Sequence, residues 1–121
     1  MDGIHQNGKA TFTAGAAIAK GEFVKFSNGN VVKCAAATDI AIGVALDGAE
    51  AGALVPVQLL TSGDTVLVKA GGAVAQGGTL SCLGTTVDTA GALQYGIALD
   101  AAENGELVEA AVGLPAVTKI A

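Results

Sequence analysis

Few side chains in the sequence could support catalysis or metal binding. His5 is the single histidine, and no serine or cysteine near it in sequence forms a nucleophile that it could activate. Cys34 and Cys82 are the two cysteines, and they lack the Cys-x-x-Cys spacing of metal and redox motifs. We therefore expect His5 to be exposed or at an interface, and both cysteines to be reduced core side chains.

Two pairs of acidic residues have the same spacing, Asp47 with Glu50 and Asp100 with Glu103. A site for a hard cation needs several converging oxygen ligands, and a glycosidase needs a carboxyl group whose pKa is raised in a pocket. Each pair instead follows an apolar run and precedes a glycine, which is typical of exposed turns capped by carboxylates. The sequence thus predicts no catalytic residue, no metal ion and no cofactor.

Lys20 has a more specific alternative interpretation. It lies between Ala19 and Gly21 in an expected turn, and lipoyl and biotinyl carrier domains, which are also twofold-repeated β structures, present their modified lysine in a turn. Those domains place Asp or Met before the lysine and Met or Ala after it, and neither neighbour of Lys20 fits. A carrier-type β-clip domain that serves an enzyme remains an alternative, and it predicts covalent modification of Lys20.

The charge balance and the apolar runs exclude two classes of partner. The chain carries six lysines, no arginine and eleven acidic residues, for a net charge of −5, so it lacks the cations that would neutralise phosphates of DNA or RNA. The apolar run at 40–46 is far shorter than the ~20 residues that a membrane-spanning helix needs. The first residues have neither a basic start nor an apolar segment, so we expect no signal peptide and intracellular synthesis.

The sequence repeats itself. The segment IAIGVALDGAEAGALV at 40–55 returns as LQYGIALDAAENGELV at 93–108, and the segment at 14–24 returns at 70–80. The repeated unit is about 55 residues long, and it conserves apolar alternation and turn glycines rather than reactive side chains. We predict a single domain at 14–121 that contains two tandem β units, 14–60 and 70–113.

The local patterns predict an all-β domain with a compact barrel-like or clip-like shape. Asn28-Gly29 between two alternating runs predicts a hairpin at 22–34, and Pro56 predicts that the run at 53–60 is an edge strand or ends there. No stretch keeps a helical period without a glycine. We expect the same apolar face of each unit to pack on the other in one core, which buries Val24, Val44, Leu46, Val57, Leu80, Ile97, Leu99 and Val108.

The N-terminal segment and the small hydrophobic core both suggest that the chain binds partners. Hydrophobic residues make up 51% of the chain, but only three phenylalanines, one tyrosine and no tryptophan contribute large aromatic side chains, so association between copies would add buried area. Residues 1–13 form a polar segment that we interpret as an extended N-terminal arm. Ile4, His5 and Phe12 are its candidate partner-binding residues.

With these motifs in place, the chain resembles the capsid cement or head decoration proteins of tailed phages, a family of small Ala/Gly-rich β proteins. The resemblance extends over about residues 13–114. The segments that carry it are AGAAIAKG at 14–21, IGVALD at 42–47, AGALVPV at 51–57, AGGAVAQG at 70–77 and YGIALD at 95–100.

The resemblance implies a virion structural protein, not an enzyme, that is made in the host cytoplasm and lies on the capsid exterior. It would bind the major capsid protein and stabilise the shell, and it would not bind nucleic acid or membrane. We expect a homotrimer, because local threefold positions offer three equal attachments. Another virion component, such as a spike or tail base, remains an alternative.

Overall fold

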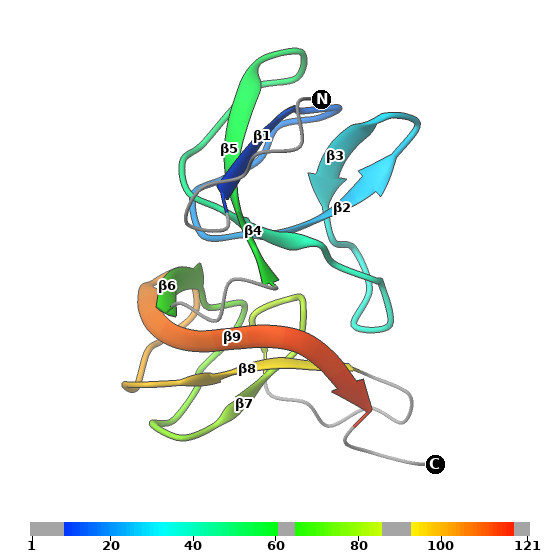
Figure 1. Ribbon diagram of the computed structural model, residues 1–121. Helices are drawn as coiled ribbons and strands as arrows, with labels where there is room; N and C mark the ends of the chain where they lie inside the picture. Colours follow the sequence, from blue (N-terminus) through cyan, green and yellow to red (C-terminus); the bar gives the residue numbers. More distant parts are fainter. Residues whose placement is uncertain (1–8, 61–64, 86–92, 118–121) are drawn as a thin grey trace.

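The computed structural model describes residues 9–60, 65–85 and 93–117. These residues form nine strands in two antiparallel sheets, which confirms the predicted all-β class. Figure 1 shows the five-stranded sheet above the four-stranded sheet. None of the described residues belongs to a helix that is long and apolar enough to cross a membrane.

The first sheet contains the hairpin that the sequence predicted. Asn28 and Gly29 both have positive φ, 49° and 83°, as the turn between two antiparallel strands requires. The strands of this sheet, in spatial order, are β1 (Lys9–Thr13), β5 (Leu54–Leu59), β4 (Gly43–Ala45), β2 (Phe23–Ser27) and β3 (Asn30–Lys33).

The second sheet has one strand fewer. Its strands, in spatial order, are β6 (Thr65–Lys69), β9 (Leu107–Val117), β8 (Leu93–Ala98) and β7 (Thr79–Leu80). The register of β8 against β9 shifts between Gln94 and Gly96, as at a β-bulge. Both sheets are open in the described residues, so the predicted barrel is not closed.

The connections of the two sheets match at equivalent positions of the sequence. Ile18 and Ala49 exchange a pair of backbone hydrogen bonds of 2.8 and 2.9 Å, and Val74 and Ala102 exchange a pair of 2.8 and 3.0 Å. The strand order β1-β5-β4-β2 of the first sheet matches the order β6-β9-β8-β7 of the second, so that β1 corresponds to β6, β5 to β9, β4 to β8 and β2 to β7. Only β3 has no counterpart among the described strands.

Two hydrophobic clusters fill the molecule, where the sequence predicted one. The larger cluster lies between the sheets and takes residues from both, including Phe23, Val44, Leu80, Tyr95 and Val108. The smaller cluster belongs to the first sheet alone, and its buried members are Ala14, Ile18, Val24, Val31, Ala45, Val55 and Val57. The first sheet therefore buries both of its faces.

Ile97 and Leu99 correct the predicted core. Each is 41% exposed, whereas Ala98 between them is 1% exposed. The second sheet turns the Ala98 side of β8 toward the first sheet, and because side chains alternate along a strand, Ile97 points outward. In the first sheet the orientation is reversed: Val44, the equivalent of Ile97, points toward the second sheet and packs between the two sheets.

The remaining members of the predicted core behave as expected. Leu46 is half-buried and packs against the larger cluster. The other five are buried: Val24, Val44, Val57, Leu80 and Val108.

Candidate interaction surface

The acidic pairs lie in exposed turns. The side-chain Oδ1 of Asp47 accepts the backbone N–H of Gly48 at 2.9 Å, and Oδ1 of Asp100 accepts the N–H of Ala101 at 2.8 Å. These bonds cap the turn that follows each apolar run. Within the described ranges, no three His, Cys, Asp or Glu side chains are grouped so that they could hold a metal ion.

One buried hydroxyl connects the two sheets. Tyr95 of β8 donates its hydroxyl hydrogen to the carbonyl of Asp39 at 2.9 Å and accepts the backbone N–H of Ala41 at 2.8 Å. Its ring packs against Phe23 of β2 with centroids 5.5 Å apart. The pKa of Tyr95 is raised mainly because burial disfavours the phenolate. Tyr95 therefore fixes the loop between β3 and β4 on the second sheet.

Asp39 stabilises the same loop through hydrogen bonds to the loop's own backbone. The Oδ2 atom of Asp39 accepts the backbone N–H groups of Ala35 and Ala36 at 2.8 and 2.9 Å, and it lies 3.0 Å from Nζ of Lys25. These hydrogen bonds, followed by the contact with Lys25, lower the pKa of the Asp39 carboxyl group. Asp39 therefore has a structural role in this loop.

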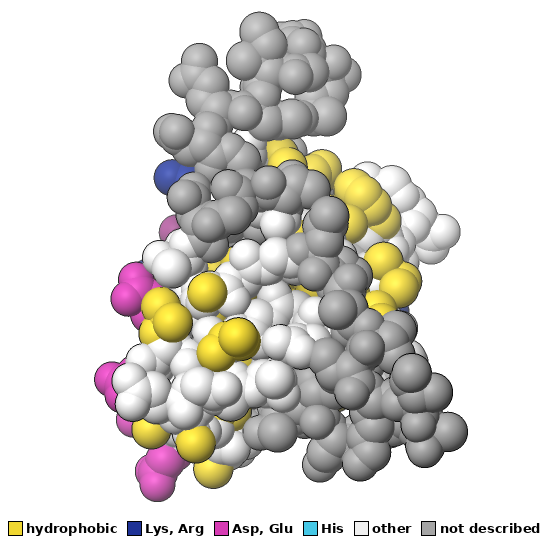
Figure 2. Space-filling view, turned by 60° about the horizontal axis from the view of Figure 1, so that its bottom comes forward, with side chains coloured by type: hydrophobic (Ala, Val, Ile, Leu, Met, Phe, Trp, Pro, Cys, Tyr) yellow, Lys and Arg dark blue, Asp and Glu magenta, His cyan; other side chains and the backbone are white. Residues whose placement is uncertain are grey.

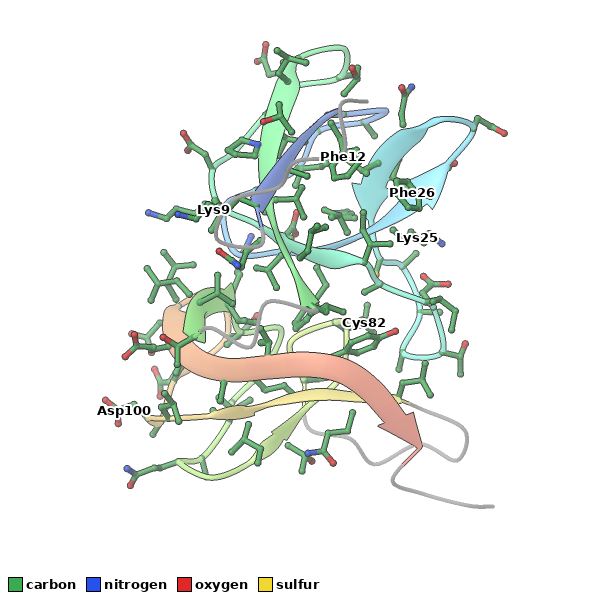
Figure 3. The ribbon with its side chains drawn as sticks, viewed as in Figure 1. Lys9, Phe12, Lys25, Phe26, Cys82 and Asp100 are labelled. Carbon is green, nitrogen blue, oxygen red and sulfur yellow. The ribbon has the colours of Figure 1, made fainter. Side chains whose placement is uncertain are left out.

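The two cysteines, which share no position in the repeat, lie next to each other in the fold. Cys34 follows β3, Cys82 follows β7, and both side chains are buried and unbonded in the larger cluster. The Sγ atom of Cys82 donates to the carbonyl of Ala36 at 3.0 Å. Figure 3 shows Cys82 at the junction of the two sheets. No local motif indicates this pairing, because 47 residues separate the cysteines.

The predicted arm residues divide between described and undescribed parts of the chain. Residues 9–13, which we assigned to the arm, form β1 and pair with β5. Phe12 in this strand is half-buried, and its ring meets that of Phe26 edge to face, with centroids 5.5 Å apart and an interplanar angle of 82° (Figure 3). Phe26 is 58% exposed. Ile4 and His5 lie outside the described residues.

A second apolar surface was not predicted. It is formed by exposed leucine and isoleucine side chains of β6, β8 and β9 and of the residue after β8, and we term it the outer face: Leu67, Ile97, Leu99 and Leu107, each 41% to 43% exposed. Strand pairing places Ala111 beside Ile97, and Glu109 beside Leu67. Seen from below the second sheet, hydrophobic side chains are spread over the surface, and acidic side chains line one edge (Figure 2).

The pattern of the strands contained a signal for this surface. A strand with one buried face alternates apolar and polar residues, but the second sheet has apolar side chains on both faces of β6, in Val66, Leu67 and Val68. Only Val66 and Val68 are buried. When several exposed apolar side chains lie close together on a protein surface, they are typical of an interaction site.

Comparisons with known proteins identify a family from the sequence and a similar fold among solved structures. A family model described as phage cement protein matches residues 4–114. Among solved structures, the fold is similar to the head fiber gp8.5 N base in bacteriophage phi29, with a TM-score of 0.67 and 22% identity over 91% of this chain and 97% of that one. The search of curated proteins found no match.

Proposed function

The chain belongs to the phage cement protein family, as its sequence resemblance predicted, and we propose that it acts as a trimer on the outer surface of the phage head. Members of this family are structural components of the virion head, not enzymes, and a cement protein binds capsid proteins. The observation that carries the place on the phage head is the family match over 4–114. The exposed apolar outer face supports the trimer, because such a face needs a partner.

We further infer that the two sheets are copies of one duplicated unit, at 14–60 and 70–113. Within these bounds, the matching orders β5-β4-β2 and β9-β8-β7 support this inference, as do the matching bonds of Ile18 with Ala49 and of Val74 with Ala102. The copies pack head to tail, so the side of β4 that carries Val44 faces the second sheet. The equivalent side of β8, with Ile97, has no sheet of the described chain over it.

The outer face is the candidate contact between copies in the trimer. In a cyclic trimer each copy presents one surface to the next copy and a different surface to the previous one. The aromatic pair of Phe12 and Phe26 lies on the other sheet, so it provides a distinct apolar contact. Association would cover the exposed side chains that the small core leaves at the surface.

Substitution of the outer face tests the trimer. The double variant Leu67→Lys and Ile97→Lys places two charges where the contact would remove water, and we expect a monomer at micromolar concentration in light scattering. Leu54→Lys is the matched control, because Leu54 is 70% exposed and occupies the position in β5 equivalent to Leu107 in β9. A monomeric natural chain would contradict the trimer, and a trimeric double variant would exclude the outer face as its contact.

We propose that the arm before β1, with Ile4 and His5, grips neighbouring capsid subunits. Phe12 is the fourth residue of β1, and its ring forms an apolar contact with Phe26 on the same sheet. Deletion of residues 2–8 keeps all of β1, so the domain should unfold at an unchanged temperature while binding to decoration-free heads falls by at least about tenfold. Equal binding of the deleted and the complete chain would refute the role of the arm.

A fibre base is the second candidate, and the fold similarity to the phi29 head fiber base favours it. In that case the chain would be one part of a longer projection from the head. A density map of purified particles separates the two candidates. Density that ends with this domain supports cement alone, and density that continues outward from it supports a base.

A further inference from the structure

We propose that Cys34 and Cys82 are a disulfide-forming site that covalently joins the two sheets when the protein meets a small oxidant. The oxidant belongs to the class of low-molecular-weight disulfides, such as oxidised glutathione. The proposal does not depend on trimer formation or on capsid binding. It concerns a dithiol that the repeat does not explain, because neither cysteine occupies an equivalent position in the other half.

The positions of the two thiols carry the inference. Cys34 is held at the end of β3, where its backbone N–H donates to the carbonyl of Phe23 at 3.0 Å. Cys82 is held two residues after β7, and its Sγ donates to the carbonyl of Ala36 at 3.0 Å. The thiols are within hydrogen-bonding reach of each other. The two side chains thus meet at one cavity, and each cysteine is tethered by a hydrogen bond to a backbone carbonyl of the first sheet or its loop.

The shared hydrogen bond also gives the two thiols different roles. It is the main reason that the pKa of Cys34 is raised, with burial second, and that the pKa of Cys82 is lowered. The charged groups that act on the pair are Asp39, which disfavours both thiolates, and Lys25, which favours the thiolate of Cys34. Cys82 is therefore the first to lose its proton, and a thiolate is the nucleophile in disulfide exchange.

A small oxidant can reach the pair. Both cysteines line an open cavity of about 280 Å³ at the junction of the sheets, together with Glu22, Lys33, Lys69 and Asn104. Four of these lining residues have charged or amide side chains, which suits a hydrophilic disulfide. The cysteine side chains themselves are only 6% and 3% exposed, so an oxidant approaches them through this cavity, which favours a small disulfide over a protein-sized one.

The reaction needs only the oxidant and the two thiols. The Cys82 thiolate attacks one sulfur of the small disulfide, forms a mixed disulfide and expels one small thiolate. The Cys34 sulfur, after losing its proton, attacks the Cys82 sulfur and expels the second small thiolate. The protein gives up two electrons and two protons, and the small disulfide takes up both as two thiols.

The new bond would join elements that otherwise meet only by packing and hydrogen bonds. It closes the chain from 34 to 82, which runs from the first sheet into the second, and so reduces the freedom of the unfolded chain. The reducing cytoplasm keeps such thiols reduced, whereas particles released from the host meet an oxidising medium. Formation of the disulfide does not depend on capsid binding, but its use after assembly rests on the proposed place of the chain on the phage head.

Oxidation of the complete chain with oxidised glutathione tests the proposal. After incubation of the folded protein, we expect intact mass to fall by two hydrogen atoms, both thiols to resist alkylation in denaturant, and the unfolding temperature to rise by on the order of 10 °C. The matched variants Cys34→Ala and Cys82→Ala separate the roles. Cys34→Ala should keep one glutathione on Cys82, and Cys82→Ala should react more slowly.

The same measurement gives the contrary outcomes. Two alkylatable thiols after prolonged incubation, two bound glutathiones, or a disulfide between two chains on a non-reducing gel would each overturn the proposal. If the internal disulfide formed equally fast in denaturant, the folded geometry would have no role and the proposal would also be wrong. The natural chain alone decides these points, so they stand even if a variant fails to fold.

Discussion

At the scale of single residues, the molecule depends more on hydrogen-bonded tethers than on reactive groups. Tyr95 is 1% exposed, and its hydroxyl serves two backbone groups of a loop that belongs to the other sheet. An aromatic side chain with a buried hydroxyl needs such partners, because an unpaired polar group in the core costs free energy. The single tyrosine thus holds together parts of the chain that are far apart in sequence.

We predict that Tyr95→Phe lowers the free energy of unfolding by about 1–3 kcal/mol, because the N–H of Ala41 loses its acceptor in a buried place. Urea denaturation measures this change. The control is Phe26→Leu, which alters an aromatic ring that is 58% exposed and should cost less than about 0.5 kcal/mol. A loss below about 0.5 kcal/mol in Tyr95→Phe would mean that the hydroxyl contributes little, because this variant keeps the ring and removes only the two hydrogen bonds.

The sequence could identify which residue types were missing from a catalytic site, but not which residues met across the sheets. The turn roles of Asp47 and Asp100 followed from local spacing. The contacts of Tyr95 with the 39–41 loop and of Cys34 with Cys82 depend on how one half docks on the other. No pattern within a short segment encodes that docking.

At the scale of elements, each sheet has one place where a glycine lets two neighbouring strands approach closely. A Cβ atom at Gly43 of β4 would overlap the carbonyl oxygen of Gln58 in β5 and lie 2.6 Å from a methyl carbon of Val57. A Cβ atom at Gly96 of β8 would lie 2.6 Å from the carbonyl oxygen of Ala111 in β9. The repeated glycine is therefore required by contact, not by a turn.

We predict that Gly43→Ala destabilises the protein by about 1–3 kcal/mol, since the neighbouring backbone of β5 must move to admit the methyl group. Thermal unfolding followed by circular dichroism measures the loss. Gly113→Ala is the matched control, because Gly113 is also a strand glycine and nothing lies within 4 Å of its added Cβ. A stable Gly43→Ala variant would show that the strands can separate at this point without cost.

The sequence predicted strands well where a local turn motif sets them, and poorly where their position depends on pairing with a distant strand. The Asn28-Gly29 hairpin is confirmed because its turn chemistry is local. Pro56 was wrongly expected at an edge or a strand end: β5 lies between β1 and β4. The proline is tolerated there because it lies opposite Leu46, one residue beyond the end of β4, where its carbonyl still accepts the Leu46 N–H at 2.8 Å.

At the scale of the whole molecule, the two sheets have matching strand orders and unequal burial. Packing like on like, the arrangement that the sequence predicted, would have hidden the same face of each unit. The described structure packs the Val44 side of β4 against the Ala98 side of β8 instead. Ile97, the equivalent of Val44, is consequently exposed. A repeat in sequence predicts equivalent strands, but the way that two equivalent units dock is decided by their unlike residues.

This difference in burial predicts that the first half can fold without the second, but the second cannot fold without the first. The first sheet has a hydrophobic cluster made only of its own residues, with Val24, Val31, Val55 and Val57 fully buried. Among the residues that the structure describes, the buried hydrophobic side chains of the second half all belong to the cluster that both halves share, where Phe23 and Val44 of the first half complete it. Without the first half, that apolar face would be open to water, and a small unit cannot bear this cost alone.

We predict that a fragment of residues 1–62 keeps strand structure on its own, while a fragment of residues 63–121 is unfolded until the first is added. Circular dichroism and amide exchange on each fragment, and then on an equimolar mixture, measure this directly. Mixing should restore slow exchange in β8 and β9, because the first half supplies the missing wall of their core. A 63–121 fragment that unfolds cooperatively by itself would contradict the dependence of the second sheet on the first. A 1–62 fragment without structure would show that the smaller cluster contributes too little to hold a sheet.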